Sequence, residues 1–250
     1  MQDMDRLQSL PNLARQAIPA RIVIGVTGHR KLDSSPLLIN AIQTAIEKVR
    51  QMVPPLRCTP LVFTILSFLA EGAGRLVVRE VLKYPEAILE VVLPLEKNDY
   101  LQDFETTESK AEFEELISLA RSVRVLTPKN SRTEAYEQVG RYIVDQCEVL
   151  IALWNGKQSS GRGGTQEIVD YARETKCPLV WINTEEQGKV MLEPGRGLSA
   201  RVFHDLDEYN SERVNTTEFK KKLRRQSDFV RCCSWHYQIL MCQHYGLPDT

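Results

Sequence analysis

Three short glycine-containing segments hold the residues of this sequence that could bind an anion. They read GVTGHR from Gly25 to Arg30, AEGAGR from Ala70 to Arg75, and GRGGTQE from Gly161 to Glu167. Each follows an apolar run, and the second and third lead into residues with helical spacing. Glycine lets the backbone approach a ligand closely, and a helix start presents unpaired N–H groups at the positive end of its dipole. The segments therefore predict a cradle for phosphate.

Side chains within these segments could complete the site. A guanidinium can bind phosphate through two N–H groups, and a threonine hydroxyl at a helix start can donate to a phosphate oxygen. Glu167 would repel phosphate, so a functional role requires a ribose nearby, where the carboxylate could stabilise positive charge at the anomeric carbon. Glu167 is the predicted catalytic residue, and the predicted ligand-binding residues are Thr27, Gly28, His29, Arg30, Glu71, Gly72, Gly74, Arg75, Gly163, Gly164 and Thr165.

Each of these residues also has a purely structural explanation. A glycine segment can be a tight turn between a strand and a helix, Thr165 can cap its helix, and Glu167 can stabilise the helix dipole. His29 can be a hydrogen-bonded structural histidine, Glu71 can fix its own loop, and the arginines can be exposed charges. Three such segments on one sheet edge nevertheless favour a ligand pocket.

Other kinds of site find no support in the motifs. The P-loop pattern GxxxxGK[ST] does not occur, and GVTGHR lacks the GxGxxG fingerprint of dinucleotide-binding folds. The six cysteines form no CxxC pair and the four histidines no HxxxH pair, so neither a metal site nor a cofactor is predicted. Cys147 and Cys177 lie in apolar segments and are predicted to be small core residues.

The bulk composition is that of an ordinary globular protein. A net charge of −1 gives no support to nucleic-acid binding, and 42% hydrophobic residues in a chain of 250 suffice for a full core. The opening MQDMDRLQSL contains two acids and no apolar stretch, unlike a secretion signal. No apolar run approaches the ~18 residues that a membrane span needs. These features predict a cytoplasmic protein.

The elements that must position the three segments alternate between strand and helix. Short β-branched runs separated by helical patterns predict a parallel sheet covered on both faces. The expected fold is a Rossmann-like three-layer α/β sandwich with a mainly parallel sheet of about six or seven strands, plus a C-terminal helix. Ligands of such sheets bind at the edge formed by the carboxyl ends of the strands. Strands are predicted over residues 21–27, 61–67, 87–93, 123–126, 149–153 and 179–182, and helices over 36–49, 74–84, 109–120, 133–147 and 164–175.

The sequence is predicted to divide into three parts. Residues 1–19 form an N-terminal arm, residues 20–205 the ligand-binding domain, and residues 206–250 a helical extension. The polar segment 185–197, EEQGKVMLEPGRG, predicts a boundary. A helix from about Thr217 carries a basic run and apolar residues near helical spacing. It is predicted to pack on the domain or on a partner, either an effector or a membrane component.

Three stretches carry a resemblance to a known family. GGTQE from Gly163 to Glu167 is similar to the PGGxGTxxE motif of LOG-type phosphoribohydrolases. VTGHR (26–30) and LAEGAGRLV (69–77) resemble the VTGHR and LAEGADRLV stretches of bacterial members of the wider SLOG superfamily. Over about residues 20–183 the chain therefore resembles this superfamily, which includes nucleotide-sensing domains.

The resemblance implies roles for the predicted residues. Glu167 matches the glutamate that helps to break the N-glycosidic bond. By this resemblance, phosphate would be held by Gly163, Gly164 and Thr165. The ligand would be lined by Gly28, His29 and Arg30, and the opposite wall would be formed by Glu71, Gly72 and Gly74. The chain departs from the family where Arg162 replaces the motif's proline and where Gly74 and Asn155 replace aspartates. The arginine motif of LOG enzymes is also missing between residues 94 and 126.

The loss of these acidic groups argues against a catalytic function more strongly than against a binding function. The leading hypothesis is a sensor domain that binds a nucleotide or a nucleotide-derived signal. The alternative is a nucleoside 5′-monophosphate phosphoribohydrolase that uses Glu167. A third hypothesis is a protein-interaction scaffold whose loops have lost their ligand. Relatives with this fold pair through helices, which predicts a homodimer.

Overall fold

The computed structural model of the protein describes residues 17–127, 131–157, 164–186 and 188–212. Most of the predicted N-terminal arm, Gly163 and the predicted helix from Thr217 lie outside the described residues. The described chain forms two compact units, one of residues 22–52 and 62–198, the other of residues 17–21, 53–61 and 199–212.

The larger unit is built on a seven-stranded sheet with the order β4-β3-β2-β1-β5-β6-β7. The sheet is parallel except for β7, which runs antiparallel to β6. This confirms the predicted Rossmann-like α/β fold with a mainly parallel sheet. The strands are β1 Ala20–Gly28, β2 Leu61–Ser67, β3 Ile88–Leu93, β4 Ser122–Val125, β5 Val149–Trp154, β6 Leu179–Asn183 and β7 Lys189–Glu193.

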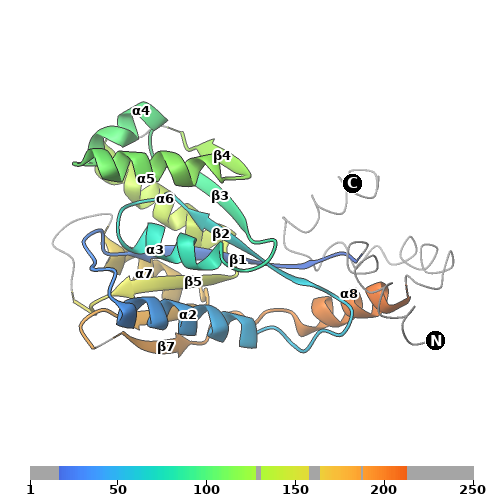
Figure 1. The fold of residues 1–250 in the computed structure, drawn as a ribbon. Helices are drawn as coiled ribbons and strands as arrows, with labels where there is room; N and C mark the ends of the chain where they lie inside the picture. Colours follow the sequence, from blue (N-terminus) through green and yellow to red (C-terminus); the bar gives the residue numbers. More distant parts are fainter. Residues whose placement is uncertain (1–16, 128–130, 158–163, 187, 213–250) are drawn as a thin grey trace. The chain divides into compact units, whose positions relative to one another are not determined.

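Helices cover both faces of the sheet, as the alternating pattern requires. Helix α2 packs beside α3 and helix α6 beside α7, and the two pairs lie on opposite faces (Figure 1). Ser35 caps α2 by accepting a hydrogen bond from the Leu38 N–H at 3.3 Å, and Pro36 occupies the first turn. The helices of this unit are α2 Pro36–Gln51, α3 Ala73–Val81, α4 Lys97–Tyr100, α5 Thr107–Ser118, α6 Arg132–Gln146 and α7 Thr165–Glu174, with a 3₁₀ turn at Leu101–Asp103.

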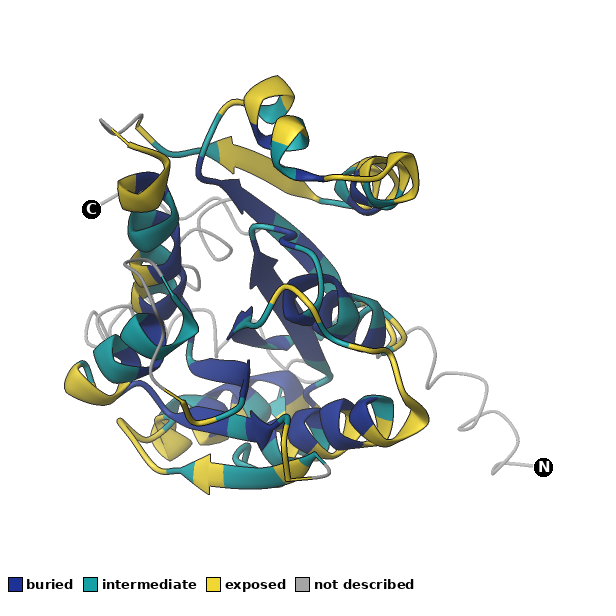
Figure 2. Cartoon of the chain, turned by 90° about the vertical axis from the view of Figure 1, so that its left-hand side faces the viewer, coloured by how far each residue is buried: buried dark blue, intermediate teal, exposed yellow. Residues whose placement is uncertain are grey.

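The core lies along the central strands, which are dark blue in Figure 2. Every residue of β5 is buried, including Trp154 at its end. Cys147 and Cys177 are buried in the same cluster, which confirms their prediction as core residues. The edge strand β4 is mostly exposed, since it has a hydrogen-bonded neighbour on one side alone.

Strand β7 was missed at the sequence level, because the segment 185–197 was predicted to be a polar boundary. The run KVMLE has only three apolar residues between charged ends, and none of its side chains is fully buried. A turn joins β6 to β7, in which the Asn183 side-chain oxygen accepts hydrogen bonds from the N–H groups of Glu185 and Glu186. Arg173 of α7 pairs with Glu193, the last residue of β7, at 2.8 Å.

The smaller unit contains helix α8 Ala200–Glu212, which was not predicted and which runs through the proposed boundary at residue 205. Phe203, Leu206 and Tyr209 are buried along one of its faces. Asn210 of α8 accepts a hydrogen bond from Ile18 N–H and donates one to the Ile18 carbonyl, each at 2.9 Å. The Asn210 side chain therefore links two segments of this unit that lie far apart in the sequence. None of the helices that the structure describes is both long and apolar enough to cross a membrane.

Candidate functional site

The strand order brings the three glycine segments to one edge of the sheet. Strand β1 lies between β2 and β5, so the chain leaves β1 toward β2 and later returns to the other side of β1. This reversal of strand order between β1 and β5 is the point at which open α/β sheets bind ligands, beyond the carboxyl ends of their strands. The three segments follow the carboxyl ends of β1, β2 and β5.

The segments after β1 and β2 are in direct contact. The Ala73 N–H donates to the His29 carbonyl at 3.0 Å. A Cβ at Gly72 would lie 2.3 Å from the Arg30 carbonyl oxygen, and Gly72 has φ of +69°. A Cβ at Gly28 would lie 2.5 Å from the Ala73 Cβ. Both glycines therefore permit a close approach of two backbones, as the structural explanation of such segments requires.

His29 joins the first segment to the end of β5. Its backbone N–H donates to the Leu153 carbonyl at 3.1 Å, and its Nε2 accepts from the Asn155 N–H at 3.2 Å. An accepting Nε2 places the proton of the neutral ring on Nδ1. His29 thus makes the hydrogen bonds that its structural explanation requires, and its ligand-binding role stays a prediction. Thr27 precedes it within β1, where it is buried opposite Ala152.

The third segment leads into α7, and the structure describes this segment from Gly164 onward. Gly164 is the N-cap, and no side chain accepts a hydrogen bond at this cap. Thr165 is the first helical residue, so the suggestion that Thr165 caps the helix is wrong. Glu167 lies in the first turn, the position at which a carboxylate also stabilises the helix dipole. Helix α3 begins in the same way, with Gly72 as N-cap and no side-chain cap.

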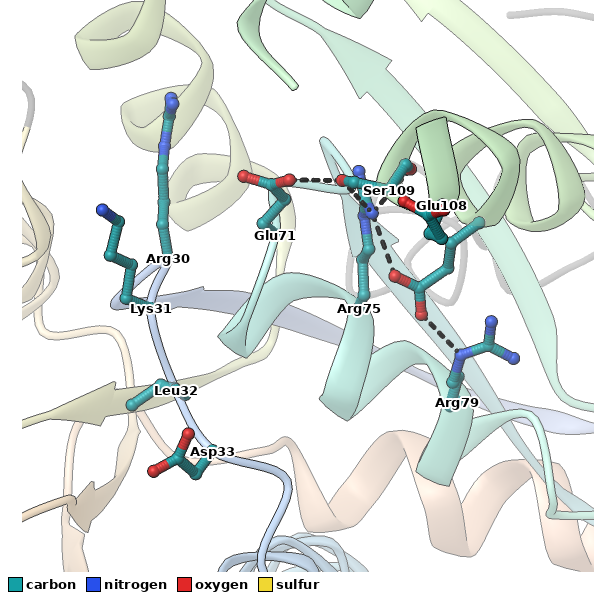
Figure 3. Close-up of a pocket in the computed structure, with 10 residues that line it drawn as sticks. Arg30, Lys31, Leu32, Asp33, Glu71, Arg75, Arg79, Glu108 and Ser109 are labelled. Atoms are coloured by element: carbon teal, nitrogen blue, oxygen red, sulfur yellow. Dashed lines mark hydrogen bonds and ion pairs between the residues drawn. The ribbon is translucent and has the colours of Figure 1, made fainter. Parts of the chain in front are cut away.

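A cavity of about 740 Å³ opens beside the first two segments (Figure 3). Arg30, Glu71 and Arg75 of the predicted residues line it, whereas Gly28, Gly164 and Thr165 are not among its lining residues. Figure 3 shows Arg30 and Lys31 projecting from the segment after β1, across from Glu71 and the arginines of α3. The lining residues are Arg30, Lys31, Leu32, Asp33, Glu71, Arg75, Arg79, Glu108, Ser109 and Glu112.

Arg75 is only 2% exposed, so its alternative interpretation as a surface charge is wrong. Its Nε donates to the Leu69 carbonyl at 3.1 Å, and its Nη1 donates to Glu112 at 2.9 Å. The guanidinium carbon lies 4.5 Å from the centre of the Phe104 ring. Burial alone would raise the pKa of Glu112, but hydrogen bonds from Arg75 and Arg79 lower it. Arg75 therefore binds α3 to α5 at one wall of the cavity.

Two buried polar atoms beside Phe104 have no hydrogen-bond partner within the described part of the chain. They are Nη2 of Arg75 and the hydroxyl of Tyr100. The Tyr100 and Phe104 rings meet edge to face with centres 5.0 Å apart, and Arg75 stacks on the same Phe104 ring. Buried donors are normally satisfied by protein, water or ligand. Arg75, which lines the cavity, and Tyr100, which does not, therefore have hydrogen-bonding capacity that the described residues do not use.

Glu71 accepts a hydrogen bond from the hydroxyl of Ser109, at the start of α5. The contact fixes Glu71 at the cavity and leaves its second carboxylate oxygen outside this bond. Gly74 is buried in the first turn of α3 and does not line the cavity. A Cβ at Gly74 would meet its nearest neighbour, Ser67 Oγ, at 3.5 Å, so the position has room for a side chain.

Arg30 is held by residues that sequence reasoning did not identify. Its guanidinium carbon lies 4.6 Å from the centre of the Tyr136 ring. The Tyr136 hydroxyl donates to Asp103, which also pairs with Arg132 at 2.8 Å. Burial and the hydrogen bond to Asp103 raise the pKa of Tyr136 to about 12, so the phenol stays protonated. No motif marked Tyr136, because it comes from α6, more than a hundred residues after Arg30.

One group of side chains has metal-ligating atoms close together within the part of the chain that the structure describes. His204, Asp205 and Glu208 of α8 place one such atom each within 4.8 Å of one another. His204 is exposed, and the group lies on the surface of a single helix. It therefore carries no argument for a metal site.

The strand order, together with the cavity beside the segments that follow β1 and β2, defines a Rossmann-like α/β protein with a polar cavity at the carboxyl edge of the sheet. No protein-family model matches the chain. A search of curated proteins finds no relative either. The fold class therefore rests on the structure, and the resemblance to the SLOG superfamily stays a prediction.

Proposed function

We propose that the protein binds a nucleotide or a nucleotide-derived signal at the carboxyl edge of its sheet and acts as a sensor domain. The observation that carries the proposal is the polar cavity at this edge, flanked by Arg30 and Glu71 from two segments in backbone contact. The carboxyl edge of an open α/β sheet is where such ligands bind, and the cavity lies at this edge beside the segments that follow β1 and β2.

The charges around the cavity favour a phosphorylated sugar over a simple polyanion. Four lining residues are basic (Arg30, Lys31, Arg75 and Arg79) and four are acidic (Asp33, Glu71, Glu108 and Glu112). Basic groups can bind phosphate oxygens, and a carboxylate such as Glu71 can accept hydrogen bonds from ribose hydroxyls. A ligand that carries a phosphate and a ribose can therefore interact with both the basic and the acidic residues of the cavity.

Two helix starts at this edge of the sheet would supply further donors. Both α3 and α7 begin at a glycine N-cap without a side-chain hydrogen bond. A phosphate at either start would be stabilised by the positive end of the helix dipole. The unpartnered Nη2 of Arg75, a residue that lines the cavity, adds a buried donor that a bound ligand or its ordered water could satisfy.

Isothermal titration calorimetry with adenosine, guanosine, cytidine and uridine nucleotides, cyclic forms included, tests the proposal. We expect saturable binding by at least one nucleotide, and a loss of about tenfold or more in Arg30→Gln, as typical for removal of a charged hydrogen bond. Arg50→Gln is the matched control, because Arg50 lies on α2 and pairs with Glu47 at 3.6 Å. No binding across the panel, or equal affinity in Arg30→Gln, would contradict the proposal.

The alternative function is hydrolysis of a nucleoside 5′-monophosphate to the free base and ribose 5-phosphate. Glu167 favours it, because this carboxylate lies in the first turn of α7, after the strand that neighbours β1. It could stabilise positive charge at the anomeric carbon while water adds there and the base leaves. Chromatography of a nucleotide incubation distinguishes the functions. Released base that disappears in Glu167→Gln supports the enzyme, whereas binding without released base supports the sensor.

We further propose that the sensor is a homodimer and passes its ligand-bound state to an effector or membrane partner. The support is the resemblance to relatives that pair through helices. Light scattering coupled to size-exclusion chromatography tests the dimer, with and without the nucleotide that calorimetry selects. A monomeric mass under both conditions would contradict it.

A further inference from the structure

Two cysteine thiols face each other in the core of the larger unit. Cys147 is the C-cap of α6 and Cys177 follows α7, and their Sγ atoms lie 3.7 Å apart. Both residues are free thiols, only 2% and 3% exposed. The distance is van der Waals contact between sulfurs, and a disulfide needs an approach to about 2.05 Å. The pair therefore stands within a small side-chain movement of a covalent bond.

The surroundings hold Cys147 in this position. A Cβ at Gly25 of β1 would lie 2.8 Å from the Cys147 Sγ, so the glycine leaves the space that this sulfur fills. The other contacts of the two thiols are weak, at 3.7 Å to the Val144 and Pro178 carbonyls. Among the described residues, the side-chain hydrogen-bond partner of each thiol is the other thiol.

The two thiols differ in acidity. The hydrogen bond with Cys147 lowers the pKa of Cys177, and the charge of Arg196 lowers it further. The hydrogen bond with Cys177 raises the pKa of Cys147, and burial raises it further. Cys177 is therefore the thiol that more readily forms a thiolate, which is the species that reacts with oxidants.

An exposed segment lies over the pair. The Arg196 guanidinium donates to the Cys147 carbonyl at 3.1 Å, and the Arg196 N–H donates to the Lys176 carbonyl at 2.6 Å. Residues 194–197 are exposed and include two glycines. Because the segment is exposed, its local opening would admit a small oxidant to Cys177.

We infer that Cys147 and Cys177 form an oxidisable dithiol that becomes an intramolecular disulfide under a hydroperoxide. The Cys177 thiolate attacks the peroxide, the O–O bond breaks, and the sulfur becomes a sulfenic acid as hydroxide leaves and takes up a proton. The Cys147 thiol then attacks this sulfur, the S–O bond breaks, and water leaves with the thiol proton. Two thiols and one hydrogen peroxide thus give one disulfide and two waters.

The disulfide would link the amino-terminal ends of two neighbouring strands. Cys147 precedes β5 and Cys177 precedes β6, and Leu150 of β5 is the register partner of Leu179 of β6. The closed loop contains β5, Gly164 and α7. Oxidation would therefore restrain the segment that carries Glu167. The bond itself would lie at the amino-terminal ends of the strands, at the opposite edge of the sheet from Glu167.

The test uses the full chain with Cys58, Cys232, Cys233 and Cys242 replaced by serine, so that Cys147 and Cys177 are the only thiols. The folded variant is treated with hydrogen peroxide, quenched, and denatured for thiol titration and intact mass. We expect both thiols to disappear, with a mass loss of two hydrogen atoms that dithiothreitol reverses. Proteolysis should yield one linked peptide that contains both cysteines. The melting temperature should rise by roughly 5–10 °C.

The same background with Cys177→Ser is the matched control, which keeps one thiol and should show no mass loss of this kind. Retention of both thiols under peroxide would overturn the inference. Oxidation to sulfinic acid without linkage would also overturn it, as would a disulfide that forms only when urea is present during the peroxide treatment.

Discussion

Gly72 and Arg30 lie so close together that a Cβ at position 72 would be 2.3 Å from the Arg30 carbonyl oxygen. The neighbouring hydrogen bond from Ala73 N–H to the His29 carbonyl fixes the same contact. The segments after β1 and β2 therefore form one continuous wall. Any side chain at Gly72 must push this wall apart.

We expect Gly72→Ala to destabilise the protein by about 2–4 kcal/mol, because it combines a positive φ with a backbone clash. Gly74→Ala is the matched control two residues further on, in the first turn of α3. Its Cβ would meet Ser67 Oγ at an ordinary 3.5 Å. Alanine also favours a helix over glycine, so this variant should be neutral or up to about 1 kcal/mol more stable. Urea unfolding followed by circular dichroism measures both, and equal losses would contradict the contact.

Arg75→Met should destabilise the protein by about 2–3 kcal/mol, because it removes a buried cation with bonds to Leu69 and Glu112. Arg79→Met is the control, since Arg79 also bonds Glu112 but is 39% exposed. An exposed ion pair contributes less than about 1 kcal/mol. Urea unfolding gives the denaturant midpoint of each variant. At equal m-values, the larger fall in midpoint identifies the variant that loses more stability. If Arg79→Met costs as much as Arg75→Met, the guanidinium of Arg75 is not the main link between α3 and α5.

Much of the fold followed from the sequence, because most of the six predicted strands carry short apolar runs. Strand β2 spans the predicted residues 61–67, and β5 was predicted to within one residue. The errors fall at the periphery of the fold. Strand β7 is an edge strand with little buried apolar surface, and α8 mixes acidic residues with a narrow buried face. Hydrophobic periodicity is weak in such elements, so it did not reveal them.

The candidate site was only partly predictable for a different reason. Glycine segments mark where backbone can approach a ligand, and they located the edge of the sheet and the residues Arg30, Glu71 and Arg75 of the cavity. Ser109 and Tyr136 come from α5 and α6 and belong to no motif. Their role depends on packing between elements distant in the sequence. The ligand-binding roles of the glycines and the catalytic role of Glu167 stay predictions.

Tyr136 should act as a positioning residue for Arg30. In Tyr136→Phe the ring below the guanidinium remains and the hydrogen bond to Asp103 is lost. We expect nucleotide affinity within about twofold of the parent and a stability loss of about 1 kcal/mol. Tyr136→Ala removes the ring, so Arg30 loses its support and affinity should fall roughly fivefold or more. Calorimetry and urea unfolding measure the two effects. Equal affinity in the phenylalanine and alanine variants would show that Tyr136 does not position Arg30.

Asp207 should make the stability of the smaller unit depend on acid pH. Burial alone would raise the pKa of Asp207, but hydrogen bonds from the N–H groups of Arg57 and Cys58 lower it. A folded pKa below the unfolded value of about 3.9 stabilises the protein above that pH. The stabilisation is lost as the pH falls through the folded pKa. Asp207→Asn should therefore be less stable than the parent at pH 7, and the difference should shrink below about pH 4. Melting curves between neutral and acid pH measure this convergence, with Asp205→Asn on the same helix as the control. A difference that stays constant as the pH falls would show that the charge of Asp207 does not stabilise the fold.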